Sequence, residues 1–277
     1  MSQADVSGLL LRTVDTVHED FVSFADLTAR WNVYTPGTGT LEPTGSTLRF
    51  VNTSTTRRRT TNAQIDDYEG LARSRYRWCP PLTMTVRARF SHPAGELSGT
   101  AGFGLWNDPF LMTGFAWPAL PRAVWFFYAS PASNMKLDID TPGQGWKAAT
   151  IDATRPSALL WAPLAPVAVP LMNIRPLYRR LWPRIQRALA VREATIEVDM
   201  TAWHTYVLHW GVGSVRFDVD GAQMLAYDRS PRGPLGFVMW LDNQSLVITP
   251  WGGFRYRRLA APGVQWMEVD SLSIETE

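Results

Sequence analysis

The sequence has very little lysine and almost no cysteine. Among 27 basic residues only Lys136 and Lys147 are lysine, an arginine bias more typical of a GC-rich genome than of a binding surface. The net charge of +2 is too small to favour nucleic acid as a partner. Cys79 is the only cysteine, which excludes an intramolecular disulfide. The four histidines and this cysteine have no metal-ligand spacing, so we expect no metal and no cofactor.

The sequence also lacks an apolar run long enough to cross a membrane as a helix. The longest run, residues 157–172, is shorter than the roughly 20 residues that a bilayer requires, and prolines interrupt it. Residues 1–20 have neither the basic start nor the apolar core of a signal peptide. We therefore expect a cytoplasmic protein, while noting that a mature secreted form without its leader would have the same pattern.

Short runs with a period of two predict strands along most of the chain. In residues 82–90 apolar side chains alternate with threonine and arginine, as in a strand with one buried face. Similar runs follow residue 195, and Asp220-Gly221 between two of them is a strong signal for a tight hairpin. Before residue 155 the other predicted strands are 47–54, 102–110, 123–130 and 135–140.

This pattern predicts an all-β fold. About a dozen short strands without βαβ alternation favour a two-sheet antiparallel sandwich. The last run, residues 264–276, has no natural partner nearby in the sequence and is expected to pair with the first strands, as in a jelly roll. No internal repeat or low-complexity linker is visible, so we expect residues 1–277 to form a single domain.

Residues 155–195 interrupt the strand pattern and are expected to form a partly helical insertion. A proline-rich apolar stretch is followed by residues 173–192, where apolar side chains recur at helical spacing with arginines between them. Pro176 and Pro183 predict a broken helix, or two short ones. Three interpretations remain open: a solvated helix packed on the sandwich, a lid over a binding face, or a basic amphipathic helix on a membrane surface through 173–192.

Residues 203–225 read WHTYVLHWGVGSVRFDVDGAQML, two alternating runs joined by a short turn. They resemble the strand–hairpin–strand signature of glycoside hydrolase family 16, the laminarinase-like enzymes of the concanavalin A-like fold. Residues 264–276 are similar to its last strand, and residues 61–66 followed by 82–90 to an earlier pair. The resemblance implies a concanavalin A-like jelly roll that acts on or binds a carbohydrate such as a β-glucan.

The resemblance also implies a catalytic strand that reads E-x-D-x-E or E-x-D-x-x-E. A retaining glycosidase needs two carboxyl groups about 5 to 5.5 Å apart, and alternate residues of one strand face the same side. This sequence has no such glutamate pair. In one placement residues 123–130 occupy the catalytic strand, and apolar side chains replace the carboxylates.

In the other placement the sequence KLDID occupies the catalytic strand. Lys136 then stands in the nucleophile's position, and an ammonium group cannot form the glycosyl ester. Asp138 and Asp140 are the candidate catalytic residues, although Asp140 is one methylene shorter than the expected glutamate. The alternative is that both line the solvent face of a strand. In either placement standard family 16 catalysis is not expected.

The chain is rich in tryptophan, with 13 residues, and aromatic faces stack on sugar rings. We therefore expect a carbohydrate-binding protein or a degenerate hydrolase that acts at the concave face of the sandwich. The alternative is a non-catalytic module whose apolar cleft and arginine-rich insertion bind a small apolar ligand, a membrane surface or a protein. The candidate ligand-binding residues are Trp106, Asn107, Trp125, Phe127, Trp240, Asp242 and Asn243.

Overall fold

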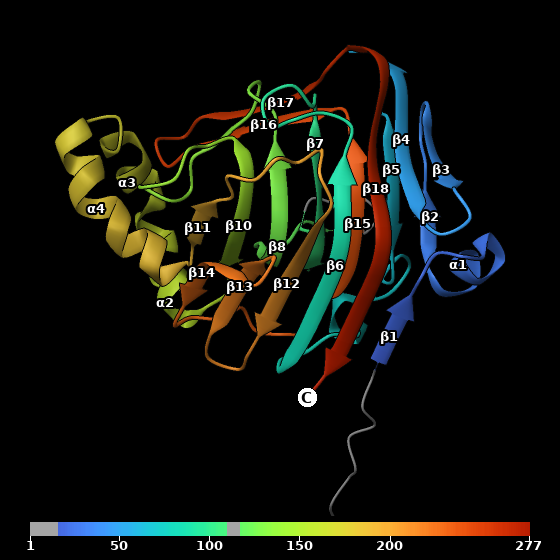
Figure 1. Cartoon of the computed structure of the whole chain (residues 1–277). Coiled ribbons are helices and arrows are strands. Elements are labelled where there is room, and N and C mark those ends of the chain that lie inside the picture. The colour runs from blue at the N-terminus through green and yellow to red at the C-terminus, as the bar shows by residue number, and fades with distance from the viewer. Residues whose placement is uncertain (1–15, 110–116) are drawn as a thin grey trace, which may run out of the picture.

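The computed structural model describes residues 16–109 and 117–277. Two large sheets lie face to face as a sandwich, and a group of helices lies at one flank (Figure 1). The predicted all-β sandwich is thereby confirmed. The first 15 residues, which bear on the expected absence of a signal peptide, and Phe110, the end of one predicted strand, lie outside the described residues.

One sheet has eight strands. Its order is β14-β13-β12-β6-β18-β4-β3, and β1 also pairs with β18. Every pairing in it is antiparallel. Its strands are β1 (Thr16–Glu19), β3 (Gly39–Pro43), β4 (Leu48–Thr55), β6 (Leu82–Phe90), β12 (His204–Trp210), β13 (Val215–Val219), β14 (Ala222–Tyr227) and β18 (Ala261–Thr276).

The other large sheet has seven strands in the order β11-β10-β8-β7-β15-β5-β2, also antiparallel throughout. The short helices α1 (Phe24–Arg30) and η1 (Arg73–Arg75) lie in the connections before β2 and after β5. The strands are β2 (Asn32–Tyr34), β5 (Asn62–Asp66), β7 (Thr100–Trp106), β8 (Arg122–Ala129), β10 (Gly145–Asp152), β11 (Arg192–Thr195) and β15 (Gly236–Asp242).

The core between the two sheets is strongly aromatic. Phe126 of β8 packs on Phe217 and Tyr206 of the facing sheet, with ring centroids 5.2 Å apart in both pairs. Phe103 of β7 lies 5.3 Å from Tyr206. These side chains occupy alternate positions on their strands, so the residues between them point out of the sandwich.

Two topological predictions are confirmed. β13 and β14 pair across the two-residue turn Asp220-Gly221, and both turn residues have positive φ, 51° and 79°, as a tight hairpin requires. The last strand, β18, pairs with β4 and β1 near the start of the chain and with β6 on its other side. This closure joins the ends of the chain within one sheet.

A third, small sheet contains β9 (Asn134–Met135), β16 (Gln244–Ile248) and β17 (Phe254–Arg258). The predicted strand over residues 135–140 is wrong, because the strand ends at Met135. Lys136 Nζ instead donates to the carbonyls of Ile139 and Thr141, at 2.8 and 2.6 Å. Such local side chain–backbone bonds fold the segment back on itself and replace a strand ladder.

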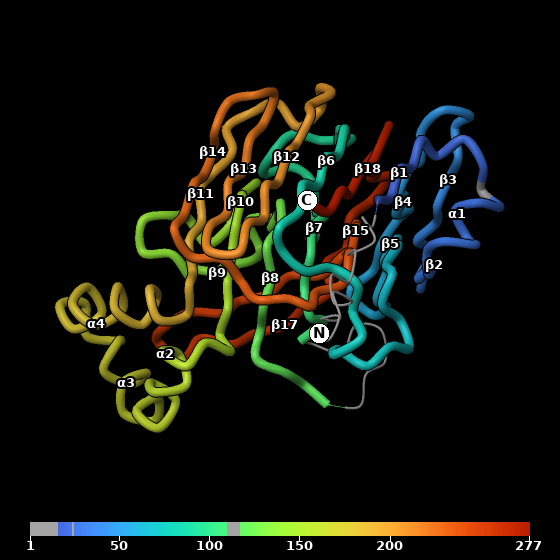
Figure 2. Tube along the Cα trace, turned by 90° about the horizontal axis from the view of Figure 1, so that it is seen from below, coloured from blue at the N-terminus to red at the C-terminus, as the bar shows by residue number. Residues whose placement is uncertain are grey.

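The helices of the insertion lie between β10 and β11 and gather at one corner of the molecule (Figure 2). The prediction of a helix broken at Pro183 is wrong, because α4 continues through this proline. Pro176 lies in the first turn of α4, where no intrahelical N–H is needed. Within the described residues no helix is long and apolar enough to cross a membrane. The helices are α2 (Pro156–Leu159), η2 (Ala162–Leu164), α3 (Ala165–Leu171) and α4 (Arg175–Ala188).

Candidate functional site

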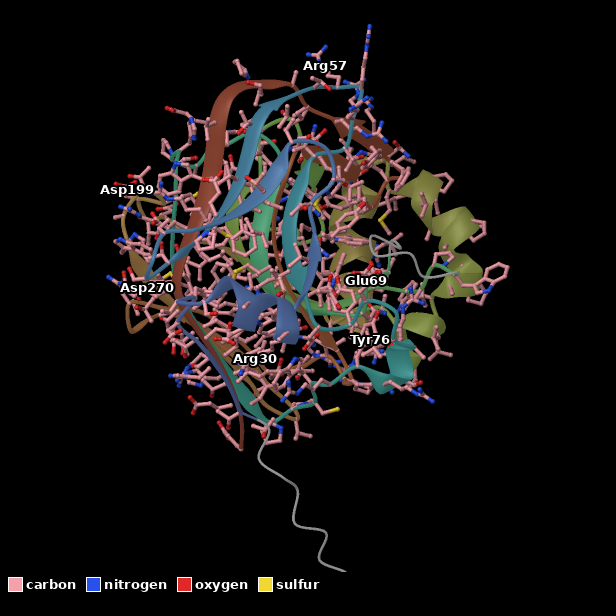
Figure 3. The ribbon with its side chains drawn as sticks, turned by 90° about the vertical axis from the view of Figure 1, so that its right-hand side faces the viewer. Arg30, Arg57, Glu69, Tyr76, Asp199 and Asp270 are labelled. Atoms are coloured by element: carbon pink, nitrogen blue, oxygen red, sulfur yellow. The ribbon has the colours of Figure 1, made fainter. Side chains whose placement is uncertain are left out.

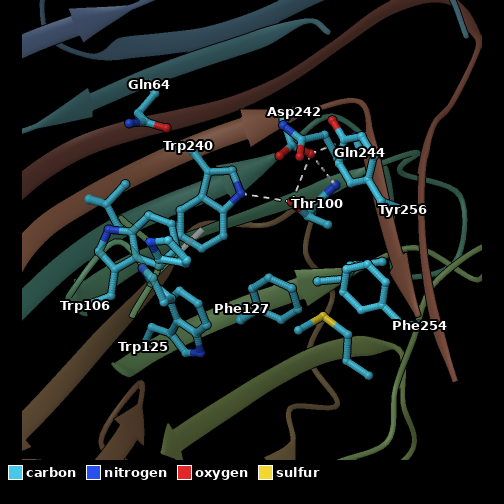
Figure 4. A pocket seen from close by; sticks show the side chains of 15 residues that line it. Gln64, Thr100, Trp106, Trp125, Phe127, Trp240, Asp242, Gln244, Phe254 and Tyr256 are labelled. Carbon is cyan, nitrogen blue, oxygen red and sulfur yellow. Dashed lines mark hydrogen bonds between the residues drawn. The ribbon is translucent and has the colours of Figure 1, made fainter. Parts of the chain in front are cut away.

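A cavity of about 480 Å³ opens on the face of the seven-stranded sheet that points away from the other sheet. The floor of this cavity comes from β5, β7, β8 and β15, and one wall comes from β16 and β17 of the small sheet. Four aromatic side chains dominate the floor (Figure 4). They are Trp106, Trp125, Phe127 and Trp240.

The alternation of β8 places its aromatic residues on both faces. Val124, Phe126 and Tyr128 point into the sandwich core, whereas Trp125 and Phe127 line the cavity. The rings of Trp125 and Phe127 stack with centroids 5.3 Å apart. One strand therefore supplies both the hydrophobic core and the cavity floor.

The other two indoles come from the neighbouring strands: Trp106 is the last residue of β7, and Trp240 lies on β15 beyond it. Trp106 and Trp240 stack nearly in parallel, with centroids 6.5 Å apart, and Trp125 lies 5.5 and 5.6 Å from them. Trp106, Phe127 and Trp240 are buried, with at most 8% of their surface exposed. The floor is thus a packed aromatic layer, and Trp125 is the ring in it that remains half-exposed.

Two glycines of β7 make room for this layer. A Cβ atom at Gly104 would lie 2.4 Å from Cβ of Trp125, and one at Gly102 would lie 3.0 Å from the ring of Trp240. Any side chain at these positions would displace the neighbouring indole. The GFG sequence of β7 is therefore a requirement of the cavity floor.

The carboxylate at the end of the cavity is Asp242, which is 4% exposed. Its Oδ1 accepts hydrogen bonds from the backbone N of Thr100 (3.0 Å), from Thr100 Oγ1 (2.9 Å) and from the backbone N of Gln244 (2.9 Å). Burial raises the pKa of Asp242 to about 6, and these hydrogen bonds limit the rise. The carboxyl group of Asp242 thus joins the end of β15 to the beginning of β7.

The other polar side chains of the floor are bonded within the protein. Trp240 Nε1 donates to Thr100 Oγ1 at 3.0 Å, and Trp106 Nε1 donates to the hydroxyl of Tyr68 at 2.7 Å. The amide of Gln64 bonds on both sides along β5, to Asn62 and to Asp66. Few of these groups remain available for a polar ligand.

The rim of the cavity is different from its floor. Phe254 and Tyr256 of β17 are exposed, 74% and 43%, and face the cavity from the wall opposite the indoles. Figure 4 shows both rings on the far side of Phe127 from Trp106. Sequence reasoning did not identify these two, nor Gln64 and Thr100. The positions of Thr100 and Gln64 in the cavity lining could have been predicted from the alternation of their strands. The sequence has no pattern that predicts the place of β17 beside this sheet.

Five of the seven predicted ligand-binding residues line the cavity: Trp106, Trp125, Phe127, Trp240 and Asp242. Asn107 and Asn243 do not. The side chain of Asn107 bonds to the backbone of Leu120 and Arg122. That of Asn243 bonds to the backbone of residues 56, 59, 61 and 259. Both amides fix loops beside the sheet.

Asp138 and Asp140, the candidate catalytic residues, lie outside the cavity lining. Asp138 is fully buried, and its two oxygens accept from the backbone N of Asp140 (2.9 Å) and of Glu193 (3.0 Å). Arg192 lies 3.6 Å from Asp138 and 3.7 Å from the exposed Asp140. In this arrangement Asp138 fixes a loop against β11.

The strand between β7 and β10 in the seven-stranded sheet is β8. Its residues on the cavity side are Ala123, Trp125, Phe127 and Ala129, so this face carries no carboxylate. Residues 123–130, the first placement of the catalytic strand, coincide with β8 except for Ser130. Residues 136–140, the second placement, form no strand.

A second buried carboxyl group with a raised pKa lies on another part of the same sheet. Burial raises the pKa of Asp67 to about 7. The two oxygens of Asp67 accept from Trp78 Nε1 at 2.5 Å and from the backbone N of Phe237 at 2.7 Å. Asp67 does not line the cavity, and both oxygens have structural partners.

No protein-family model matches the sequence, and no curated protein sequence matches it. Solved structures with a similar fold include a Crh5 transglycosylase in complex with NAG, with TM-score 0.51 and 15% identity over 94% of this chain and 84% of that chain. An endo-β-galactosidase from Clostridium perfringens that releases GlcNAcα1-4Gal has TM-score 0.56 and 10% identity over 95% of this chain and 61% of that chain.

An endo-acting O-glycanase from members of the human gut microbiota has TM-score 0.52 and 11% identity over 94% of this chain and 98% of that chain. At such identities the likeness shows the fold. It confirms the predicted concanavalin A-like jelly-roll sandwich, a fold that these three enzymes share.

Proposed function

We propose that this protein binds a small apolar molecule in the aromatic cavity and does not cleave glycosidic bonds there. One observation carries the proposal: the cavity side of β8 presents Ala123, Trp125, Phe127 and Ala129 and no carboxylate. In one of the two placements drawn from the family 16 resemblance, this strand is the one that would hold the catalytic carboxylates. Without two opposed carboxyl groups the retaining mechanism has neither nucleophile nor proton donor.

The polarity of the cavity favours an apolar ligand over a glucan. Each sugar hydroxyl that is buried without a hydrogen-bond partner costs free energy. The floor offers few such partners, because Thr100, Asp242 and Gln64 already bond within the protein. An apolar ligand has no such requirement, and the volume of about 480 Å³ is in the range of small-molecule sites.

Titration with the neutral apolar fluorophore N-phenyl-1-naphthylamine tests the proposal. We expect saturable binding with fluorescence enhancement, and at least about tenfold weaker binding by Trp125→Ala, because loss of one stacked indole removes more than about 1.4 kcal/mol of contact. Trp203→Ala is the matched control. Trp203 is also half-exposed, but it stacks with Arg87 and Arg89 of the other sheet. Equal affinity of both variants would contradict an apolar site at Trp125.

A second candidate, carbohydrate binding, is favoured by the exposed rings of Phe254 and Tyr256 and by the fold shared with glycan-acting enzymes. Exposed aromatic rings stack on the apolar faces of sugars. Competition distinguishes the two candidates: displacement of the fluorophore by laminarin oligosaccharides would favour the carbohydrate. Displacement by long-chain alcohols but not by oligosaccharides is the outcome that we expect.

A further inference from the structure

The helices between β10 and β11 carry a charge that the rest of the chain does not share. From residue 153 to residue 192 there are seven arginines, no lysine and no acidic residue, whereas the whole chain has 27 basic and 25 acidic residues. Residues 153–192 thus carry +7, and the remainder carries 20 basic against 25 acidic residues, or −5. Five of these arginines form no ion pair with another described residue: Arg175, Arg179, Arg180, Arg184 and Arg187.

The same helices expose apolar side chains. Six of the 14 large hydrophobic residues exposed in the described part of the chain lie between residues 159 and 174. Leu160 is 78% exposed and Val167 64%. A cluster of exposed leucines on short helices marks an interaction surface. The six are Leu159, Leu160, Leu164, Val167, Leu171 and Ile174.

We propose that residues 159–187, the docking face, bind the surface of an anionic lipid bilayer. Exposed leucine and isoleucine beside arginine, without acidic residues, is the composition of interfacial membrane helices. Anionic headgroups complement the arginines, and the leucines enter the boundary between headgroups and acyl chains. Acidic side chains such as Asp199 and Asp270 lie on the opposite side of the molecule from the helices (Figure 3).

A second copy of this chain is a poorer occupant of the docking face. In a two-fold dimer the same patch meets itself, which would place the unpaired arginines of one copy against those of the other. Like charges at an interface oppose association, and no acidic residue between 153 and 192 offsets them. A bilayer with negative headgroups removes this repulsion.

The docking face connects with the aromatic cavity through the hairpin of β16 and β17. Leu246, Phe254 and Tyr256 of this hairpin line the cavity. At its tip the ring of Trp251 packs on Tyr178 of α4, with centroids 5.5 Å apart, and the carbonyl of Trp251 accepts from Asn173 at 3.3 Å. Contact with a bilayer would therefore bring the cavity wall close to the source of apolar molecules.

Vesicle co-sedimentation tests the docking face. We expect the protein to sediment with phosphatidylcholine vesicles that contain about 30 mol % phosphatidylglycerol, and little with phosphatidylcholine alone. The triple variant Arg179→Glu, Arg180→Glu, Arg184→Glu should bind the anionic vesicles at least about tenfold more weakly, since each arginine contributes to the attraction. Leu160→Ser with Leu164→Ser should also weaken binding.

The matched control is the triple variant Arg57→Glu, Arg58→Glu, Arg59→Glu. These three arginines are exposed, and the variant changes the net charge by the same amount. They lie in the connection between β4 and β5, across the molecule from α2, α3 and α4 (Figure 1). Equal loss in both triple variants would show a general charge effect and overturn the docking face. Equal sedimentation with both kinds of vesicle would also overturn it, as would a dimer in sedimentation velocity that Leu160→Ser dissociates. We expect Trp125→Ala to bind the anionic vesicles as wild type does, because Trp125 lies in the cavity and not in the docking face. This result would show that the two sites can fail independently.

Discussion

At the residue scale, alternation within strands predicted the cavity better than chemical type did. Trp125 and Phe127 lie two residues apart on β8 and both line the cavity. Asn107 and Asn243 have side chains suited to a ligand, yet loop backbone occupies their amides. A sequence does not reveal whether an asparagine after a strand bonds to a ligand or to its own loop, because its partners are distant in the chain.

Asp242 makes stability depend on pH. An acid whose pKa is higher in the folded than in the unfolded state stabilises the fold below its unfolded pKa, and this stability is lost as pH rises through the folded pKa. For Asp242 the window runs from about 4 to about 6. We expect wild type to lose about 2 kcal/mol of unfolding free energy between pH 4 and pH 7 relative to Asp242→Asn, whose amide oxygen can accept the same hydrogen bonds.

Urea denaturation at both pH values measures this difference. Asp228→Asn is the control, because Asp228 is exposed and the chemical change is the same. The same pH dependence in wild type and Asp242→Asn would contradict the assignment of this effect to Asp242.

At the element scale, strands with clean alternation were predicted correctly, and the loop after β9 was not. The residues of this loop look like a strand with acidic side chains. The loop is held instead by residues far along the chain: Asp138 accepts from the backbone N of Glu193, and Ile139 N donates to Gln186 at 3.1 Å. Tertiary partners of this kind override local pattern.

The buried pair of Lys147 and Glu193 joins β10 to β11. Lys147 Nζ lies 2.8 Å from Glu193 Oε2, and their side chains are 1% and 6% exposed. Burial raises the pKa of Glu193, and Lys147 opposes the rise. We expect Lys147→Met to lower the unfolding free energy by about 3 to 5 kcal/mol, because it leaves a carboxylate buried without its cation.

The double variant Lys147→Met, Glu193→Leu should recover most of this loss in chemical denaturation. Arg87→Met, which breaks an exposed pair with Asp270, should cost less than about 1 kcal/mol. A loss of similar size in Arg87→Met and Lys147→Met would contradict a special role for burial.

At the scale of the whole molecule, the sequence predicted the sandwich because its two ends carry strands that pair with each other. β18 lies between β6 and β4, so the sheet closes only when the entire chain has folded. The sequence could not place the helices. Their apolar residues have helical spacing, but the contacts that fix them, such as Tyr178 on Trp251, join segments about 70 residues apart.

The whole fold also predicts the absence of an activity. Incubation with laminarin or lichenan should release no reducing ends above background, because Asp242 is the single carboxylate among the described residues that line the cavity. Release of reducing ends that disappears in Asp242→Asn or Asp140→Asn would contradict this expectation. Asp228→Asn provides the control for a surface change.

The two lysines have a practical consequence. Lys136 donates to two carbonyls of the loop after β9, and Lys147 donates to the carbonyl of Pro142 and to Glu193. Because the chain has no other lysine, an acylating reagent meets no ε-amine that is unbonded in the native state. Acylation at these positions would require residues 136–142 to open. The rate at which each lysine gains an acyl group, read residue by residue in mass spectrometry, would therefore report the opening of this loop.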